Sequence, residues 1–259
     1  MSAQQTTTKP LVTIVTGTYN SSKFISDCVK SIHNQTFENI EHIIIDGNSN
    51  DNTVSIIENM PNRVSKLVSE KDEGIYDAMN KGLKMADGEI VGILNSDDFY
   101  NSNEVIQMVV KAFEDPLIDC VYGDLVYVDQ LNTDKVVRNW VTGPYTKKAF
   151  TKGWHPAHPS FFVRNTVYKK LGYFNLNFEL AADLIGYTEV WQSEAPKIKG
   201  KYLPISMVRM RLGGATNKSI KNILKGNNEC VAAFKVNDLK VSAAYPIYRL
   251  LPKLKQYLK

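Results

Sequence analysis

Residues 12–46 read VTIVTGTYNSSKFISDCVKSIHNQTFENIEHIIID, and the apolar pattern of this stretch decides the fold. A β-branched run at Val12–Thr16 precedes apolar residues at helical spacing from Phe24 to Ile32, which Ser21 or Ser22 could cap. A second apolar run follows at Glu41–Asp46. The order predicts a strand, a helix and a second strand, the repeating unit of a parallel α/β sheet.

The same alternation continues along the chain. The predicted elements are a helix at Thr53–Asn59, a strand at Val64–Ser69, a helix at Ile75–Met85, a strand at Ile90–Leu94 and a helix at Asn103–Phe113. Nearly continuous apolar strands that alternate with helices indicate a mostly parallel sheet covered on both faces. We therefore predict an α/β fold.

After Asp115 the pattern changes. We predict a hairpin from Cys120–Asp129 and Lys135–Val141, a strand at Ser160–Arg164 and a helix at Thr166–Leu171. This part should complete the sheet and form the second wall of a cleft. The expected organisation is one domain over residues 1–216, with halves at about 11–115 and 116–216, and a helical extension over 217–259.

Composition excludes several classes of protein. The chain has 259 residues and is 43% hydrophobic and 22% charged, values close to the globular average, so collagen-like, coiled-coil and disordered classes are excluded. No apolar run reaches the ~18 residues of a membrane span, and residues 1–9 lack the pattern of a secretory signal, so we expect a cytoplasmic protein. Three dispersed cysteines without a CxxC pair predict neither a disulfide framework nor a thiolate metal site.

Charge is divided unevenly between the two parts of the chain. Residues 195–259 carry 14 Lys and Arg against two acidic residues, a net charge of +12, whereas residues 1–194 carry −8. In residues 240–259, leucines and isoleucines recur at helical spacing among five basic residues, although Pro252 interrupts this helix. Such a segment either docks peripherally on the inner face of an anionic membrane or packs on the domain with its lysines in solvent.

Polar residues follow the predicted strands at the point where each one ends. They stand at Thr18–Asn20, Asp46–Asp51, Glu70–Gly74 and Asn95–Asp98. Ligands of parallel sheets bind at this edge, and the sequence lacks both GxGxxG and GxxxxGK[ST], which disfavours Rossmann-type dinucleotide binding and P-loop phosphoryl transfer. Acidic residues here can instead bind a nucleoside and hold Mn²⁺ or Mg²⁺ against a diphosphate.

Eight stretches of the sequence form an ordered succession of motifs: Val12–Asn20, Asp46–Thr53, Ser69–Gly82, Leu94–Asp98, His155–Phe162, Leu171–Phe174, Ala181–Asp183 and Arg211–Thr216. Together they resemble family 2 glycosyltransferases of the GT-A fold, most of all bacterial enzymes of the colanic-acid type that build cell-surface polysaccharides on lipid carriers. They cover about residues 11–217.

The resemblance implies inverting transfer of a sugar from a nucleotide diphosphate, by default UDP, to a hydroxyl of a saccharide or lipid-linked saccharide. It implies nucleotide-sugar binding by Thr18, Tyr19, Asn20, Asp46, Asp72, Asp77, Asn80, Lys81, Asn95, Ser96 and Asp97. Asp97 would also hold the Mn²⁺ or Mg²⁺ ion, and Asp183 would be the catalytic base. His158 and Arg211 are further candidates for contacts with the acceptor or the diphosphate.

Two features depart from the family pattern. Asn95 stands where many relatives carry the first Asp of the metal motif, and Leu184–Val190 follows Asp183 where a tyrosine and a continuous amphipathic helix are expected. No QxxRW pattern follows Asp183, and relatives that polymerise processively carry one. We therefore expect one sugar to be transferred per event.

Two other functions compete with sugar transfer. A sugar nucleotidyltransferase also uses paired acids on an α/β sheet, but it needs a basic, glycine-rich loop after the first strand, and no cation follows Gly17 until Lys23. A noncatalytic polyanion-binding protein would use the basic tail, but apolar residues between its charges are more typical of an interfacial segment. We expect no nucleic-acid partner.

Overall fold

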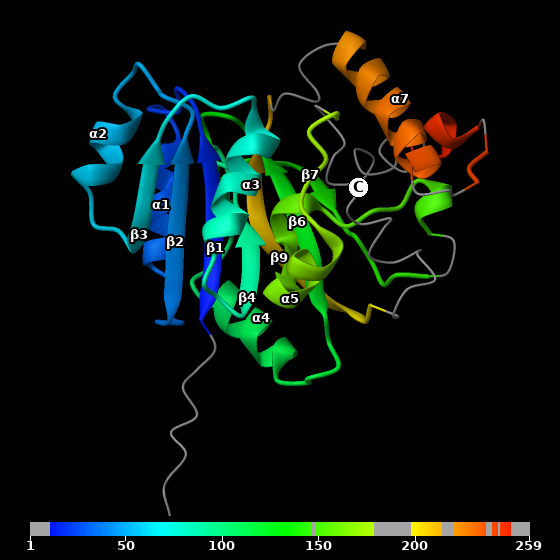
Figure 1. Cartoon of the computed structure of the whole chain (residues 1–259), viewed down its shortest axis with the longest axis horizontal. Helices are drawn as coiled ribbons and strands as arrows, with labels where there is room; N and C mark the ends of the chain where they lie inside the picture. The colour runs from blue at the N-terminus through cyan, green and yellow to red at the C-terminus, as the bar shows by residue number, and fades with distance from the viewer. Residues whose placement is uncertain are drawn as a thin grey trace, which may run out of the picture.

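The computed structural model describes residues 11–146, 149–178, 198–213, 220–236, 240–242 and 244–249. These residues form an α/β structure around a sheet of nine strands (Figure 1). The strands are β1 (Val12–Thr18), β2 (Ile40–Asp46), β3 (Val64–Ser69), β4 (Ile90–Ile93), β5 (Phe99–Tyr100), β6 (Cys120–Val128), β7 (Val136–Trp140), β8 (Phe161–Arg164) and β9 (Gly200–Arg211). The helices are α1 (Ile25–His33), α2 (Thr53–Glu58), α3 (Ile75–Met85), α4 (Val105–Phe113), α5 (Asn165–Leu171) and α7 (Ile220–Val236), with short 3-10 helices η1 (Phe150–Lys152) and η2 (His158–Ser160).

The first half of the sheet is parallel, as the sequence predicts. Its order is β3-β2-β1-β4, and β1 pairs in parallel register with both β2 and β4. All seven residues of β1 are buried, which explains its nearly continuous run of apolar and small residues. The carboxyl ends of these four strands lie at one edge of the sheet.

The second half is mixed. β8 lies between β4 and β6 and runs antiparallel to both. β6 also pairs with β7, which runs antiparallel to it, and with β9, which runs parallel to it. The sequence did not predict β9, in which Lys201, Pro204 and Arg209 interrupt the apolar pattern, or the two-residue strand β5. The predicted hairpin, however, is confirmed as β6 and β7.

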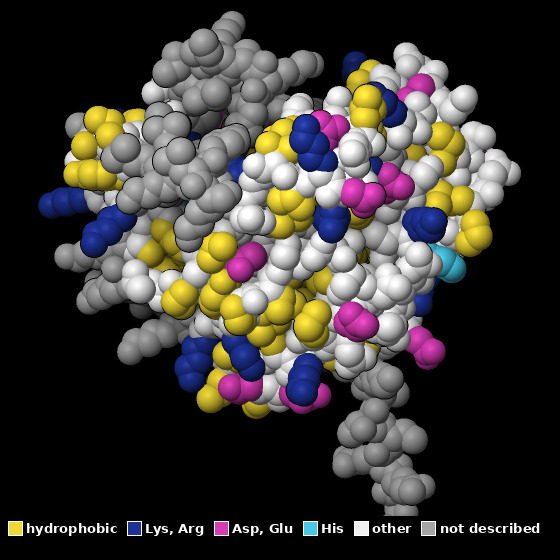
Figure 2. All heavy atoms as spheres, turned by 180° about the vertical axis from the view of Figure 1, so that it is seen from behind, with side chains coloured by type: hydrophobic (Ala, Val, Ile, Leu, Met, Phe, Trp, Pro, Cys, Tyr) yellow, Lys and Arg dark blue, Asp and Glu magenta, His cyan; other side chains and the backbone are white. Residues whose placement is uncertain are grey.

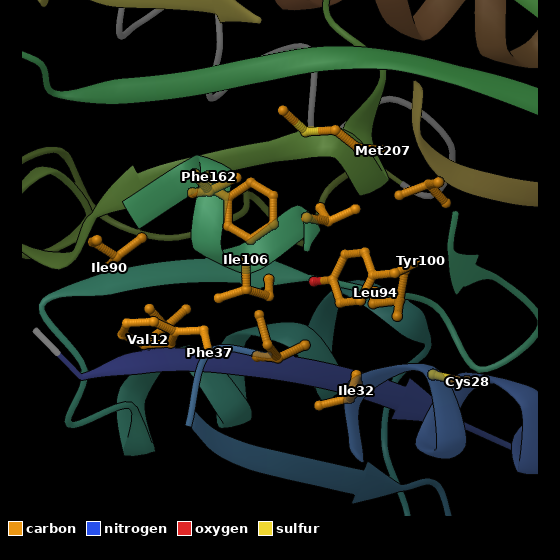
Figure 3. Packing of buried hydrophobic residues seen from close by; sticks show 14 of the residues in the cluster. Val12, Cys28, Ile32, Phe37, Ile90, Leu94, Tyr100, Ile106, Phe162 and Met207 are labelled. Carbon is orange, nitrogen blue, oxygen red and sulfur yellow. The ribbon is translucent and has the colours of Figure 1, made fainter. Parts of the chain in front are cut away.

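The two faces of the sheet carry separate cores. The larger core contains residues of α1 and α4 together with Phe162 and Met207 from the sheet, and Figure 3 shows their interdigitation around Ile106 and Tyr100. On the opposite face, α3 contributes Ala78 and Leu83. Buried residues of α5 and α7 extend this second layer over β6 and β8.

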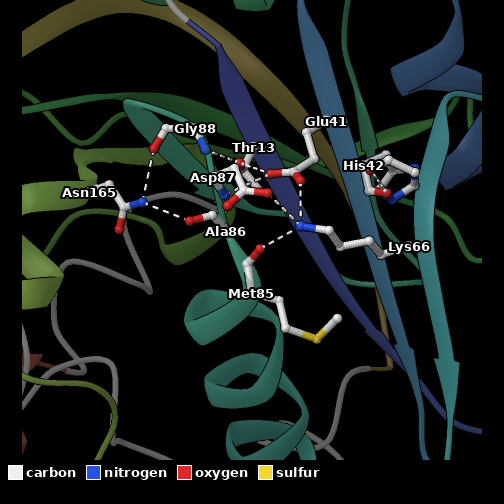
Figure 4. A network of polar contacts seen from close by, with 10 residues as sticks. Thr13, Glu41, His42, Lys66, Met85, Ala86, Asp87, Gly88 and Asn165 are labelled. Carbon is white, nitrogen blue, oxygen red and sulfur yellow. Dashed lines mark hydrogen bonds and ion pairs between the residues drawn. The ribbon is translucent and has the colours of Figure 1, made fainter.

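A polar network closes the edge of the sheet opposite the carboxyl ends (Figure 4). The Lys66 ammonium group lies 2.9 Å from the Glu41 carboxylate and 2.7 Å from that of Asp87. Glu41 also accepts a hydrogen bond from the Thr13 hydroxyl, and that hydroxyl oxygen accepts one from the amide of Gly88. The network thus joins three strands to the turn between α3 and β4.

The start of α1 differs from the prediction. No side chain caps this helix, and it begins at Ile25. The carbonyl of Ser21, rather than its hydroxyl, accepts hydrogen bonds from the amides of Phe24 and Ile25, while the Ser21 hydroxyl pairs with Ser96. The prediction of a serine cap was therefore wrong, because the serine side chain is used at the carboxyl edge of the sheet.

The described part of the C-terminal tail packs on the domain. Tyr245 is fully buried and its ring centroid lies 5.0 Å from that of Phe234 in α7. Arg249 donates a hydrogen bond to Asn227, while Ile247 is 58% exposed. The tail prediction extends to Lys259, and residues 250–259 lie outside the described part.

Three observations bear on the predictions made from composition. Within the described ranges, no helix combines the length and apolarity needed to cross a bilayer. On the face opposite that of Figure 1, acidic and basic side chains are interspersed among apolar ones (Figure 2). The three cysteines are buried free thiols, as expected.

Candidate active site

The carboxyl edge of the parallel strands collects most of the predicted site residues. Residues that end or follow β1, β2, β3 and β4 meet here, because these strands are adjacent and parallel. The members at this edge are Thr18, Tyr19, Asn20, Asp46, Asp72, Asn95, Ser96 and Asp97. Their proximity follows from the topology, since each stands at the end of its strand.

Asp46, the last residue of β2, shapes the turn that follows it. Its buried carboxylate accepts a hydrogen bond from the Ser49 amide at 2.9 Å, and further bonds from the hydroxyls of Ser49 and Ser69. These donors come from the turn itself and from the end of β3. Asp46 therefore ties the loops after two strands together.

Two asparagines allow the loops after β1 and β2 to approach. Asn20 and Asn48 have φ angles of 48° and 64°, in the left-handed region that asparagine tolerates better than most residues. The Asn20 side-chain oxygen accepts a hydrogen bond from the Asn50 amide at 3.0 Å, and its backbone amide donates to the Ser49 hydroxyl at 2.8 Å. The turn chemistry of these residues thus builds the edge.

Thr18, the last residue of β1, and Tyr19, which follows it, lie in different environments. The Tyr19 ring is 61% exposed, so an aromatic face stands open at the edge of the sheet. The hydroxyl of Thr18 is buried and has no hydrogen-bond partner among the described residues. The exposed ring of Tyr19 offers a planar group a face for stacking.

Asp72 lies against the loop after β2. A Cβ atom at Gly47 would lie 2.6 Å from Asp72 Oδ2, so any larger residue here would displace the carboxylate. Asp72 also accepts a hydrogen bond from the amide of Gly74, the residue before α3. Asp72 is thereby fixed beside the turn that Asp46 organises.

Asp77 and Lys81 lie one turn apart on α3. The Lys81 ammonium group is 2.8 Å from the Glu70 carboxylate, which raises the pKa of Lys81, and 3.4 Å from that of Asp77. Asp77 accepts a hydrogen bond from the Glu73 amide, and Lys81 donates one to the Lys71 carbonyl. Both side chains thus support the loop at 70–74.

Asn80 is buried and binds the backbone of a distant segment. Its amide nitrogen donates to the Phe174 carbonyl at 2.8 Å, and its oxygen accepts from the Phe174 amide at 2.9 Å. The geometry joins α3, which begins beside the nucleotide-binding loops predicted from the sequence, to residues after α5. Both polar groups of Asn80 are occupied by this contact.

The loop at 95–98 follows β4 and carries the predicted metal residue. The Asn95 amide nitrogen donates to Asp98 at 3.1 Å, and the Ser96 and Ser21 hydroxyls lie 2.9 Å apart. No side chain of the described residues donates a hydrogen bond to the Asp97 carboxylate. Asp97 therefore retains acceptor capacity that Asp46 has already used.

Burial dominates the electrostatics of this loop. It raises the pKa of Asp97, against the opposing effect of the Arg211 charge, and raises that of fully buried Asp98 well above the usual range with the help of the Asp97 charge. One oxygen each of Asn95 and Asp98 is buried without a hydrogen-bond partner among the described residues. Such oxygens are stabilised by a cation or a polar ligand.

The residues present fit a divalent cation that is bound together with a substrate. Within the described ranges there is no group of three or more His, Cys, Asp or Glu side chains placed to hold a metal. Mg²⁺ is commonly held by one or two carboxylates plus substrate phosphates, and an all-protein cage is not required. Asp97, beside unpartnered oxygens, meets that requirement.

Arg211, the last residue of β9, lies beneath the loop. It is 4% exposed and donates a hydrogen bond at 2.6 Å to the Asp97 backbone carbonyl. Its guanidinium group also pairs with Asp27 of α1, and lies 4.9 Å from the ring centroids of both Phe24 and Phe99. The described contacts of Arg211 thus support the loop at 95–98, called the metal loop here for its predicted role, and the contact of Arg211 with acceptor or diphosphate stays a prediction.

His158 begins η2, a segment that contacts β4 and β6. Its ring centroid lies 6.1 Å from that of Phe174, the residue held by Asn80. His158 and Asn80 therefore border the same segment. Asp183, the predicted base, lies outside the described residues.

Sequence reasoning missed several residues of this edge. Ser49, Ser69 and Ser21 hold the predicted acids and loops through their hydroxyls. Isolated serines in polar loops carry no pattern that marks such contacts. Asp124, a charged residue inside the otherwise apolar strand β6, does carry such a signal.

Residues 13–172 match the family model described as Glycosyl transferase family 2. The chain belongs to this family. It is 30% identical over 182 residues to an uncharacterized glycosyltransferase of Mycobacterium tuberculosis, covering 68% of this chain and 67% of that protein.

Solved structures of glycosyltransferases share the fold. S. aureus TarS 1–349 in complex with UDP-GlcNAc superposes with a TM-score of 0.65 at 17% identity, over 91% of this chain and 69% of that one. The mannosyltransferase PcManGT from Pyrobaculum calidifontis, in complex with GDP-Man and Mn²⁺, gives a TM-score of 0.66 at 22% identity, over 97% of this chain and 70% of that one. A longer TarS chain is matched over 44% of its length. The family and the GT-A-type fold predicted from the sequence are thereby confirmed.

Proposed function

We propose that this family 2 glycosyltransferase moves one sugar, with inversion, from a UDP-sugar to a hydroxyl of a lipid-linked saccharide during surface polysaccharide synthesis. One observation carries the proposal: the Asp97 carboxylate and unpartnered buried oxygens stand at the carboxyl edge, beside the loops organised by Asp46 and Asp72. Family membership favours sugar transfer over nucleotidyl transfer.

The nucleotide is proposed from geometry and likeness together. We assign nucleoside binding to Thr18, Asn20, Asp46 and Asp72, which stand at the carboxyl edge of the sheet. The exposed ring of Tyr19 offers a stacking face for the base. TarS is solved with UDP-GlcNAc and PcManGT with GDP-Man and Mn²⁺. UDP is our choice, and GDP is the alternative.

Asp97 would hold a Mn²⁺ or Mg²⁺ ion together with the donor diphosphate. Such an ion, when bound, neutralises charge that develops on the leaving diphosphate. Asn95 and Asp98 fix the loop around it, and Arg211 fixes the Asp97 backbone. Asp77, Asn80 and Lys81 support this account as positioning residues, because each binds the backbone of a site segment.

The chemistry needs a base opposite the leaving group. We assign this role to Asp183, which takes the proton of the acceptor hydroxyl while the acceptor oxygen forms its bond to C1 of the donor sugar. The bond between C1 and the diphosphate oxygen breaks in the same step, and the nucleoside diphosphate leaves with the electron pair. His158, on η2, is proposed to contact the acceptor or the diphosphate.

A lipid-linked acceptor would make peripheral membrane contact useful. Ile247 and Tyr248 are 58% and 45% exposed beside Arg249, so the described start of the tail presents apolar and basic groups together. These features are typical of an interfacial segment. Co-sedimentation with anionic vesicles, for the full chain and for a chain ending at Val241, tests this contact.

The test of the proposed function is donor use by the purified full chain. UDP-glucose, UDP-GlcNAc and GDP-mannose are screened by thermal shift and by slow hydrolysis, with Mn²⁺ or with excess chelator. We expect one donor to be hydrolysed only with the ion, and Asp183→Asn to lower turnover by ~10²–10⁴ while donor affinity is retained. Equal hydrolysis in chelator contradicts the role of Asp97, and unchanged turnover in Asp183→Asn moves the base elsewhere, with Glu179 and Glu189 the next candidates.

A further inference from the structure

Asp124 is a carboxylate in the middle of an apolar strand and has a defined set of partners. Its Oδ1 accepts a hydrogen bond from the Thr142 amide at 2.7 Å. The Tyr202 hydroxyl of β9 lies 2.9 Å from both carboxylate oxygens. Burial raises the pKa of Asp124, although the residue is only partly buried. The carboxylate is thus held in one orientation, on a residue that is partly exposed.

The sheet topology brings the strand of Asp124 close to the strand that leads into the loop at 95–98. Gly92 of β4 and Val121 of β6 both pair with Phe162 of β8, and β4 and β6 run in the same direction. Two strand spacings, about 10 Å, therefore separate β4 from β6, and Asn95 and Asp124 both follow the paired residues toward the carboxyl edge. Between these strands lies η2, which contacts both of them, and Ser160 at its end donates a hydrogen bond to the Gly123 carbonyl.

The backbone around Asp124 departs from regular pairing. Tyr122 pairs with Tyr202 but Asp124 pairs with Ser206, and the register shifts again before Leu125. A Cβ atom at Gly123 would lie 2.7 Å from the Met207 side chain, so only glycine allows β9 to approach here. Bulges of this kind redirect side chains and are frequent beside active sites.

A cluster of aromatic rings begins at Tyr202, whose hydroxyl contacts the carboxylate. The centroid of Tyr122 lies 5.6 Å from that of Tyr202 and 5.8 Å from that of Trp154, and Trp154 lies 5.6 Å from Tyr145. Tyr145, Trp154 and Tyr202 are all partly exposed. A carboxylate accepts hydrogen bonds from sugar hydroxyls, and aromatic faces pack against the apolar face of a pyranose ring.

We propose that Asp124, framed by Tyr145, Trp154 and Tyr202, is a pyranose subsite whose carboxylate accepts hydrogen bonds from ring hydroxyls beside the metal loop. The subsite rests on the proposed function, because it needs a sugar nearby. The spacing of about 10 Å between β4 and β6 is of the size that a hexose attached to a diphosphate at Asp97 would span. Either the transferred sugar or the acceptor sugar has the required chemistry.

The experiment compares binding of UDP with binding of the UDP-sugar that the wild-type chain prefers, by calorimetry with Mn²⁺. Asp124→Asn keeps the shape of the side chain and an acceptor for the Thr142 amide, so the fold should persist. The matched control is Asp119→Asn, since Asp119 precedes the same strand and accepts a hydrogen bond from the Lys199 amide at the other end of the β6–β9 pair.

We expect Asp124→Asn to bind UDP as wild type does and to bind the UDP-sugar about tenfold more weakly, a loss of about 1.4 kcal/mol. An acceptor KM raised by the same factor, with unchanged donor binding, would assign the subsite to the acceptor ring. If UDP itself binds more weakly, or if neither sugar is affected, the subsite is refuted. Failure of the wild-type chain to bind any nucleotide sugar would instead contradict the proposed function.

Discussion

Replacement of Arg211 by methionine separates positioning of the metal loop from direct binding of substrate. Methionine keeps the apolar stem of the side chain but removes the charge, the hydrogen bond to the Asp97 carbonyl and the contacts with Phe24 and Phe99. The ion pair with Asp27 adds little, because the Asp27 side chain is 52% exposed. The change therefore acts mainly on the backbone of the metal loop.

The magnitude follows from these contacts. A buried hydrogen bond from a charged donor contributes about 1.5–3 kcal/mol, and a cation–π contact about 0.5–1 kcal/mol. We expect Arg211→Met to lower the free energy of unfolding by about 3 kcal/mol in urea titrations. We also expect UDP affinity in the presence of Mn²⁺ to fall about tenfold, since the Asp97 carboxylate loses its fixed position.

Asp27→Asn is the matched control for this prediction. It removes the charge that faces Arg211 but leaves the hydrogen bond to Asp97 in place. It should change UDP affinity less than twofold. Wild-type UDP affinity in folded Arg211→Met, or an equal loss in both variants, would refute the positioning role.

Three further predictions concern other parts of the site and its support. Gly47→Ala should weaken UDP binding several-fold by displacing Asp72, whose Oδ2 would lie 2.6 Å from the new Cβ. The control is Gly88→Ala, whose new Cβ meets Thr13 at the opposite edge of the sheet and should lower stability while UDP binding stays intact. Equal UDP affinities in the two variants would contradict this prediction. Asn80→Ala should lower kcat about tenfold with unchanged UDP affinity, because it releases both hydrogen bonds to Phe174; a fall in UDP affinity would show direct contact with the donor instead. Burial lowers the pKa of His42 from 6.5 to about 3, so the unfolded chain binds a proton more readily and stability falls as pH drops below 6.5. This residue should account for about 2 kcal/mol of the stability lost between pH 7 and pH 5. Urea unfolding of the wild-type chain should therefore depend more steeply on pH than that of His42→Gln, and parallel pH dependences would contradict the assignment.

Local pattern was sufficient for the parallel half of the sheet. Val64–Ser69 and Ile75–Met85 are observed with the predicted bounds, because buried parallel strands and amphipathic helices leave strong periodic signals. The strand β9 left no such signal, since its bulges and its Pro204 break the alternation. Long-range pairing with β6 stabilises it instead.

The sequence predicted the location of the candidate site more completely than the role of each residue in it. Strand ends mark the edge, so Asp46, Asp72 and Asp97 could be found from the sequence. The engagement of Asn80 with Phe174, and of Arg211 with the Asp97 carbonyl, joins residues 94 and 114 positions apart. No local pattern encodes such contacts, and a polar residue near a site looks the same whether it binds substrate or backbone.

The central claim is that a nucleoside diphosphate and a divalent cation bind together at Asp97. The most direct measurement is UDP affinity by calorimetry with Mn²⁺ and with excess chelator, for the wild-type chain and for Asp97→Asn. The account predicts that Mn²⁺ strengthens UDP binding at least tenfold in the wild-type chain and has no effect in the folded variant, a difference of about 1.4 kcal/mol or more. Equal UDP affinity with and without the ion in the wild-type chain, or an undiminished effect of Mn²⁺ in Asp97→Asn, would contradict it.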